Sequence, residues 1–270
     1  MRTATDRPAA ARDRRRARRG LRSTALALAA ATALSACASL DIPQMPGPAV
    51  TDFVPTQVPQ ATPTSSGNLS PDGFQQAQRM AVRIRNVGCD SLSPGSGVAI
   101  YTGSGFAIGP TTLITNRHVV ANSASLQVAT YDGRDVAVTA TSTAALADLA
   151  LVRTAQELPS YPFLAGSDPE IGAEVTVVGY PEGGQLTLTR GRVIGSTTDP
   201  LNENFGQVLV TDAQVEPGSS GSAVLDAEGR VVGVVYAKNA SDQSFFVPVS
   251  TLGSLLADDG SFTDAPACVR

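Results

Sequence analysis

Residues 216–223, with the sequence EPGSSGSA, contain the residue types needed for attack by a serine hydroxyl. A hydroxyl becomes a nucleophile when a base removes its proton, and the attack creates an oxyanion that needs hydrogen-bond donors. Glycines beside a serine let the main chain turn sharply and bring N–H groups together. We therefore expect Ser220 to be the nucleophile, and the N–H groups of Gly218 and Ser220 to form an oxyanion hole. By itself, such a Gly-Ser run is more often a plain turn.

Two further residues have the chemistry of a base and its partner. His118, the single histidine of the chain, lies in the segment TNRHVV at the end of an expected strand, where a general base is held rigidly near solvent. Asp148 lies in the apolar run ADLALV, where a carboxylate is costly unless it is paired, and an imidazole N–H is one such partner. The plainer alternatives are an ordinary surface or core histidine and a turn aspartate. Asp132 and Asp135 are rival carboxylates, but a hairpin turn explains them.

The elements that must position these residues are short strands. The 270 residues include 25 glycines and 18 prolines, and this composition favours many strands and turns over long helices. We predict an all-β fold of two six-stranded antiparallel β-barrels, at about 79–155 and 168–250, with a short C-terminal helix at 248–257. The expected strands are 81–87, 97–101, 105–108, 112–115, 126–131, 136–141, 149–152, 174–180, 185–194, 207–211, 222–225, 231–238 and 245–249.

The order His118, Asp148, Ser220, together with the segments TNRHVV, DLAL and GSSG, resembles the chymotrypsin-fold, trypsin-like serine peptidases. The similarity extends over about residues 78–255 and is greatest to the bacterial Htr-type group. The chain is also similar to the actinobacterial membrane-anchored acid-resistance peptidases, which carry a disulfide near the ends of the domain. The resemblance implies that His118 takes the proton of Ser220 and that Asp148 orients His118.

The resemblance also implies where a substrate binds. Val235, Tyr236 and Ala237 would belong to a strand that pairs with an extended peptide. Gln214, six positions before Ser220, would lie at the base of the pocket for the residue preceding the cleaved bond. Because Gln214 is neutral, a strong preference for lysine or arginine there is not expected. Ser222 departs from the second glycine that many members have at this position.

The N-terminal third is expected to serve export and attachment. Residues 1–22 are basic, an apolar run follows to Leu34, and the segment LSAC ends at Cys37. This pattern resembles a bacterial lipoprotein signal over residues 1–36, with lipid, including palmitate, on Cys37. The alternative is an ordinary cleavage site beside an unmodified cysteine. Residues 37–73, rich in Pro, Thr, Ser and Gln, are expected to be a disordered tether ahead of a peptidase domain at 74–270.

The charge and the cysteines indicate which partners are unfavourable and in which compartment the protein acts. The net charge is −4, but nine of the 20 basic and two of the 24 acidic residues precede position 23, which leaves −11 for the rest. Such a surface should repel nucleic acid and anionic lipid. Cys89 and Cys268 are expected to form a disulfide in an exported protein, with two free thiols as the alternative. One histidine and scattered cysteines give no reason to expect a metal or cofactor.

The leading hypothesis is a serine endopeptidase that cleaves proteins or peptides through an acyl-enzyme. It would be lipid-anchored at the outer face of the bacterial cell membrane. The alternatives are a non-catalytic peptide-binding module on the same scaffold and an esterase that uses the same three residues. The physiological substrate and the oligomeric state stay open.

Overall fold

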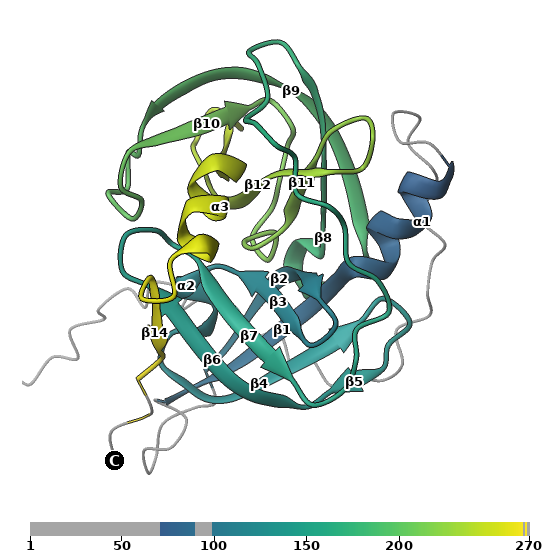
Figure 1. Ribbon diagram of the computed structural model, residues 1–270, viewed down its shortest axis with the longest axis vertical. Coiled ribbons are helices and arrows are strands. Elements are labelled where there is room, and N and C mark those ends of the chain that lie inside the picture. Colours follow the sequence, from purple (N-terminus) through teal and green to yellow (C-terminus); the bar gives the residue numbers. More distant parts are fainter. Residues whose placement is uncertain (1–70, 90–98, 267, 269–270) are drawn as a thin grey trace, which may run out of the picture. The chain divides into compact units, whose positions relative to one another are not determined.

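The computed structural model describes residues 71–89, 99–266 and 268 (Figure 1). The expected signal segment, Cys37 and the tether up to residue 70 lie outside the described residues, so those predictions stay open. Helix α1 (Pro71–Met80) leads directly into the first strand. No helix in the described part of the chain has the length and apolarity to cross a bilayer.

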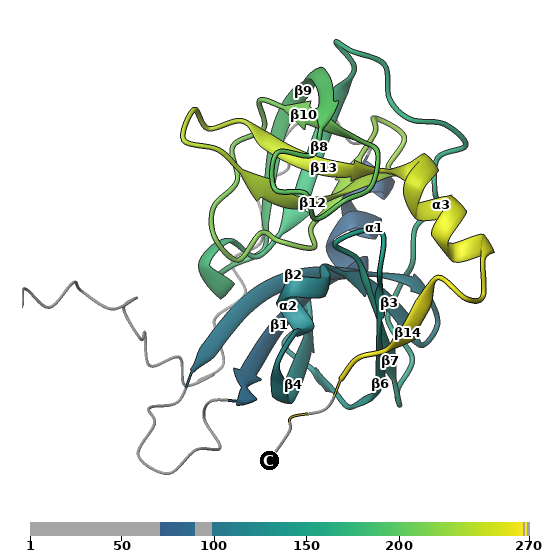
Figure 2. The ribbon, with the colours of Figure 1, turned by 90° about the vertical axis from the view of Figure 1, so that its left-hand side faces the viewer.

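The first half of the domain is one curled antiparallel sheet with eight strands in the order β14-β6-β7-β3-β2-β1-β4-β5 (Figures 1 and 2). Alternating burial along β1 matches its period-two pattern of apolar residues. The strands are β1 (Ala81–Gly88), β2 (Ile100–Gly109), β3 (Thr112–Thr115), β4 (Ser123–Thr130), β5 (Asp135–Val136), β6 (Val138–Ala144), β7 (Ala150–Thr154) and β14 (Phe262–Asp264).

The second half is a closed barrel with the strand order β10-β13-β12-β11-β8-β9. Helix α3 (Val249–Ala257) follows the barrel, and the chain then returns to the first sheet, where β14 pairs with β6. The strands are β8 (Glu174–Gly179), β9 (Thr187–Thr198), β10 (Gln207–Thr211), β11 (Ala223–Leu225), β12 (Val231–Lys238) and β13 (Ser244–Pro248). The described residues also form the short helix α2 (Arg117–Val120) and the 3-10 helix η2 (Pro181–Gly183).

The predicted all-β class and the C-terminal helix are confirmed, and the first half differs in detail. It is a curled sheet of eight strands, not a closed barrel of six. Ile100 and Tyr101, the last two residues of the expected strand 97–101, and the whole expected strand 105–108 belong to the single strand β2, which begins at Ile100. Gly103 lies inside that strand because α2 packs closely there, and a Cβ atom at Gly103 would come within 2.5 Å of Val119. The expected strand 136–141 is divided between β5 and β6, which pair with different neighbours.

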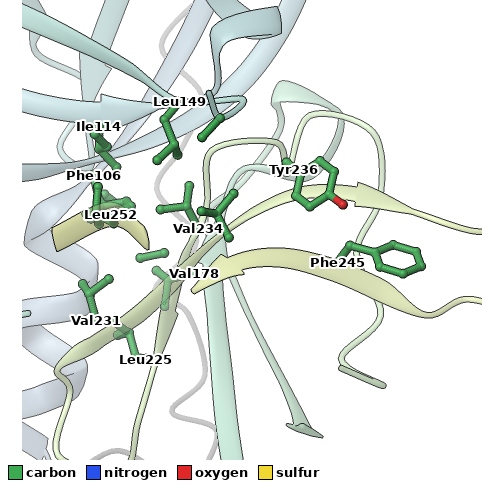
Figure 3. Close-up of a cluster of buried hydrophobic side chains, with 14 of the residues drawn as sticks. Phe106, Ile114, Leu149, Val178, Leu225, Val231, Val234, Tyr236, Phe245 and Leu252 are labelled. Carbon is green, nitrogen blue, oxygen red and sulfur yellow. The ribbon is translucent and has the colours of Figure 1, made fainter. Parts of the chain in front are cut away.

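A hydrophobic core joins the two sheets and keeps their facing loops in register. Its buried side chains come from both halves and from α3, as Figure 3 shows for Phe106, Ile114, Val234 and Leu252. Because protein interiors are closely packed, this shared core fixes how the two sheets lie against each other. At the C-terminal end, a disulfide joins Cys89 to Cys268, with Cα atoms 5.5 Å apart.

Candidate active site

His118 lies on the short helix α2, directly after β3. Asn116 precedes the helix in an extended conformation, and Val119 and Val120 are buried beneath it. The far end of α2 is held by Asn86 on β1, whose amide donates hydrogen bonds to the carbonyl oxygens of Val119 and Ala121, both at 2.9 Å. The His118 side chain itself is 48% exposed. The sheet therefore fixes the main chain of His118 while its ring reaches solvent.

Asp148 lies in the turn before β7 with a buried carboxylate that faces His118. One carboxylate oxygen accepts the His118 main-chain N–H at 2.9 Å, and the other lies 2.5 Å from His118 Nδ1. The Asp148 main chain is held by two amides, because Asn116 donates to its carbonyl at 2.7 Å and Asn204 accepts from its N–H at 2.9 Å. A proton on Nδ1 makes this hydrogen bond, so the lone pair of the neutral ring is on Nε2.

Ser220 lies in the turn between β10 and β11, and its residue is half-buried. Gly218 has a φ of +92°, a conformation that L side chains rarely adopt. A Cβ atom at Gly218 would also lie 2.6 Å from the Glu182 nitrogen, because η2 packs against the turn. Glycine is thus required at Gly218 by both conformation and space.

Ser104 on β2 fastens this turn to the first sheet. Its hydroxyl donates to the Gly218 carbonyl and accepts the Tyr180 N–H, both at 2.8 Å. Its main-chain N–H donates to the Ser220 carbonyl at 2.8 Å. Its own carbonyl accepts a hydrogen bond of 2.7 Å from the hydroxyl of Thr115, three residues before His118. The Ser220 turn and the His118 segment therefore share one anchor.

The N–H groups of Gly218 and Ser220 have no hydrogen-bond acceptor within the described part of the chain. The preceding carbonyl, that of Pro217, is directed towards η2, where it accepts the Glu182 N–H at 2.5 Å. Unpaired main-chain N–H groups are costly in a folded protein unless a ligand or water accepts from them. The turn that carries Ser220 thus offers two main-chain donors without an acceptor among the described residues.

The residues expected to bind substrate differ in their availability. Gln214 is exposed in the segment between β10 and the Ser220 turn. Val235 is buried, and its N–H and carbonyl are already bonded to Ser222 and Gly221, which leaves it no main-chain group for a peptide. Tyr236 is buried with its hydroxyl on Asp199, so only its main chain remains. The expected peptide-pairing edge is thereby reduced to Tyr236 and Ala237.

Sequence reasoning did not single out the polar residues that hold this site. Ser104, Asn116 and Asn204 are buried, and each forms at least one hydrogen bond within the site. Asn116 stands in the segment TNRHVV, but no local pattern marks Ser104, which lies between two glycines, or Asn204, which lies between Glu203 and Phe205. Burial raises the pKa of Tyr180, the tyrosine whose N–H donates to Ser104. Over residues 71–89, 99–266 and 268, no cluster of His, Cys, Asp or Glu side chains is arranged to hold a metal ion.

The chain is similar to known serine proteases. Residues 103–234 match the trypsin-like peptidase domain. The mitochondrial serine protease HTRA2 of Bos taurus is 31% identical over 206 residues, covering 73% of this chain and 44% of that protein. The serine protease Do-like HtrA of Bacillus subtilis is 34% identical, covering 55% of this chain and 34% of that protein.

A solved structure is similar over a larger share of both chains. The active form of the Rv3671c protease from M. tuberculosis superimposes with a TM-score of 0.64 at 27% identity, covering 82% of this chain and 99% of that chain. The serine protease Rv3671c of Mycobacterium tuberculosis is 31% identical in an alignment of 175 residues that covers 60% of this chain and 43% of that protein. The chain thus spans less than half the length of the curated relatives described here.

Proposed function

Because the chain carries a chymotrypsin-fold peptidase domain of the HtrA type, we propose that it is a serine endopeptidase in which Ser220, His118 and Asp148 form the catalytic triad. Its substrates are proteins or peptides, the class that serine proteases of this family cleave. A neutral Gln214 disfavours substrates with lysine or arginine before the cleaved bond.

The observation that carries the proposal is the contact between His118 and Asp148. A buried carboxylate that accepts both the main-chain N–H and the Nδ1 proton of one histidine fixes the ring orientation and its tautomer. It also stabilises the imidazolium that forms when Nε2 takes a proton. A role in packing alone would not explain why the buried Asp148 carboxylate is paired with an imidazole that is half-exposed to solvent.

The proposed reaction follows from these groups. The Ser220 hydroxyl transfers its proton to His118 Nε2 as its oxygen bonds to the carbonyl carbon of the substrate. The negative charge moves to the carbonyl oxygen, and the N–H groups of Gly218 and Ser220 donate to it. The intermediate collapses as the carbon–nitrogen bond breaks, and His118 protonates the leaving amine. A water molecule then repeats the sequence on the acyl-enzyme and releases the acid.

A fluorophosphonate probe tests the nucleophile directly, because it reacts with serine hydroxyls activated by a base. The wild-type chain should be labelled, and Ser220→Ala should not. Ser219→Ala is the matched control, since it removes the neighbouring hydroxyl, and labelling should persist. Labelling that survives Ser220→Ala overturns the triad, and peptide binding without labelling or cleavage supports a binding module instead.

The proposed place of action is the outer face of the cell membrane. The support is the LSAC segment ending at Cys37, and export also agrees with the DegP-like relative from Hahella chejuensis, described as a probable periplasmic serine endoprotease. Cells fed radiolabelled palmitate should label the wild-type chain but not Cys37→Ser. Equal labelling of both, or a soluble wild-type chain, contradicts lipid attachment at Cys37.

A further inference from the structure

The loop that joins β9 to β10, called here the β9–β10 loop, is built around one buried carboxylate. Asp199 is 3% exposed and accepts five hydrogen bonds. Four come from the loop itself, from the main-chain N–H groups of Leu201, Glu203 and Asn204 and from the Asn204 side-chain amide, at 2.7 to 2.9 Å. The fifth comes from the Tyr236 hydroxyl on β12, at 2.5 Å.

These hydrogen bonds keep Asp199 ionised. Burial alone would raise the pKa of Asp199, but the Tyr236 hydroxyl and the amide groups of Leu201 and Asn204 donate to it and together lower the pKa below its ordinary value. The charged carboxylate raises the pKa of Tyr236 in turn, in the same direction as burial. A hydrogen bond to an ionised group is stronger than one between neutral groups, so the loop is firmly closed.

Asn204 connects this closed loop to Asp148. Its amide nitrogen donates to Asp199, and its amide oxygen accepts the Asp148 N–H at 2.9 Å. The next residue, Phe205, donates its N–H to the Leu146 carbonyl at 2.7 Å, so the loop docks on the Asp148 turn at two points. Asn204 itself is 7% exposed, and both ends of its amide are used.

A second contact reaches the helix that carries His118. Glu203 in the β9–β10 loop forms an ion pair with Arg117, the residue before His118. Both side chains are partly exposed, so this pair contributes little by itself. It shows, however, that the loop touches α2 as well as the Asp148 turn. The loop therefore contacts both the turn that carries Asp148 and the helix that carries His118.

We propose that Asn204 is a positioning residue for Asp148 and His118, and that Asp199 couples Asn204 to Tyr236 on the strand expected to bind substrate. This inference rests on the proposed function. Asn204 touches no reacting atom, and it acts by fixing the main chain from which the Asp148 carboxylate reaches His118. Asp199 holds Asn204 and Tyr236 at once, so a shift of β12 at Tyr236 is transmitted to Asp148.

The experiment measures the rate of fluorophosphonate labelling, and kcat and KM for cleavage of fluorescent casein, on the whole chain. Asn204→Ala should slow labelling and lower kcat about tenfold, with KM changed less than about twofold. Asn239→Ala is the matched control, because Asn239 closes its own turn through Ser241 and Gln243. If Asn204 contributes to stability alone, Asn204→Ala lowers the unfolding temperature but leaves kcat per folded molecule unchanged. That result overturns the inference.

The link through Asp199 has its own test. Tyr236→Phe removes one hydroxyl donor and keeps the packing, and labelling should slow about threefold. In the double variant with Asn204→Ala, the second change should add nothing, because both act through the same path. If the double variant instead slows labelling by the product of the two single effects, the link between Tyr236 and Asn204 through Asp199 is overturned. If Asn204→Ala fails to fold, Tyr236→Phe alone decides, and an unchanged labelling rate overturns the coupling.

Failure of this inference is separable from failure of the proposed function. A wild-type chain that is not labelled, or a labelled Ser220→Ala variant, contradicts the triad itself. A wild-type chain that is labelled at Ser220, with Asn204→Ala labelled at the same rate, leaves the triad intact and removes the positioning role.

Discussion

The hydroxyl of Ser104 donates a hydrogen bond of 2.8 Å to the carbonyl oxygen of Gly218, across 114 positions of the sequence. This bond fixes the plane of the peptide between Gly218 and Ser219, and it ties the Ser220 turn to β2. The same hydroxyl accepts the Tyr180 N–H from the end of β8. Ser104, which is itself fully buried, therefore organises the turn that carries the proposed oxyanion donors.

Ser104→Ala should lower both activity and stability. The Gly218 carbonyl and the Tyr180 N–H each lose a buried partner, which costs about 1–3 kcal/mol in the free energy of unfolding. The loosened turn should lower kcat about tenfold, since one misaligned oxyanion donor costs at least that much. Urea unfolding and peptidase kinetics measure the two effects. Ser254→Ala, on the exposed face of α3, is the control, and equal values for both variants contradict the anchor role.

Asp148→Asn should remove most of the activity with little change in fold. The amide keeps the shape of the carboxylate, but it no longer stabilises an imidazolium at His118 and favours the wrong tautomer. We expect kcat/KM to fall about a thousandfold or more. Asp135→Asn is the control, because this rival carboxylate lies exposed on β5. A loss below about tenfold contradicts the role assigned to Asp148.

Ser222→Ala should stabilise the protein. The Ser222 hydroxyl is buried and has no hydrogen-bond partner among the described residues. Removing an unpaired buried hydroxyl should raise the free energy of unfolding by about 1 kcal/mol. Ser244→Ala is the comparison variant with the opposite expected effect. The Ser244 hydroxyl donates to the Ala213 carbonyl at 2.6 Å, so its removal should destabilise the folded protein. Urea midpoints that move in the same direction for both variants contradict this account.

The stability of the domain should depend on pH through Asp199. Its pKa is lower in the folded chain than in the unfolded chain, because the hydrogen bonds that it accepts outweigh the effect of burial. Its contribution is therefore fully present above the unfolded-chain pKa and is lost as pH falls through the lower folded pKa. Asp199→Asn should destabilise strongly at pH 7 and progressively less in acid, whereas the exposed Asp259→Asn should show no such convergence. Thermal unfolding from pH 7 to pH 3 measures the difference, and a gap that widens in acid contradicts the sign.

The disulfide should stabilise the domain by tying its C-terminal end to the first strand. Cys89 and Cys268 are 179 positions apart, so the bond restricts a long segment of the unfolded chain. Cys89→Ser should lower the free energy of unfolding by about 2–4 kcal/mol. A reductant should destabilise the wild-type chain by a similar amount and leave Cys89→Ser unaffected. A reductant effect on the variant contradicts this assignment.

The local pattern of apolar and turn residues was sufficient to predict most strands of the second half. The expected strands 207–211 and 231–238 have the bounds of β10 and β12. Their apolar runs end at turn residues, and this information lies within a few positions of each strand. The strands of the first half were less predictable. The local sequence around Gly103 favours a turn, whereas the structure has the continuous strand β2 there. Only the packing of α2 against β2 shows that this glycine makes room for Val119.

The residue types at His118, Asp148 and Ser220, and their order along the chain, were evident from the sequence, because each carries its chemistry within a short motif. The tertiary structure alone decided how they are held. Ser104 reaches Gly218 and Asn204 reaches Asp148 over separations of 114 and 56 positions. Such bonds depend on which strands pair and how loops pack, and a buried polar side chain must find its partner wherever the fold provides one. The sequence therefore determined the chemistry that this protein carries, and packing between distant segments decided its geometry.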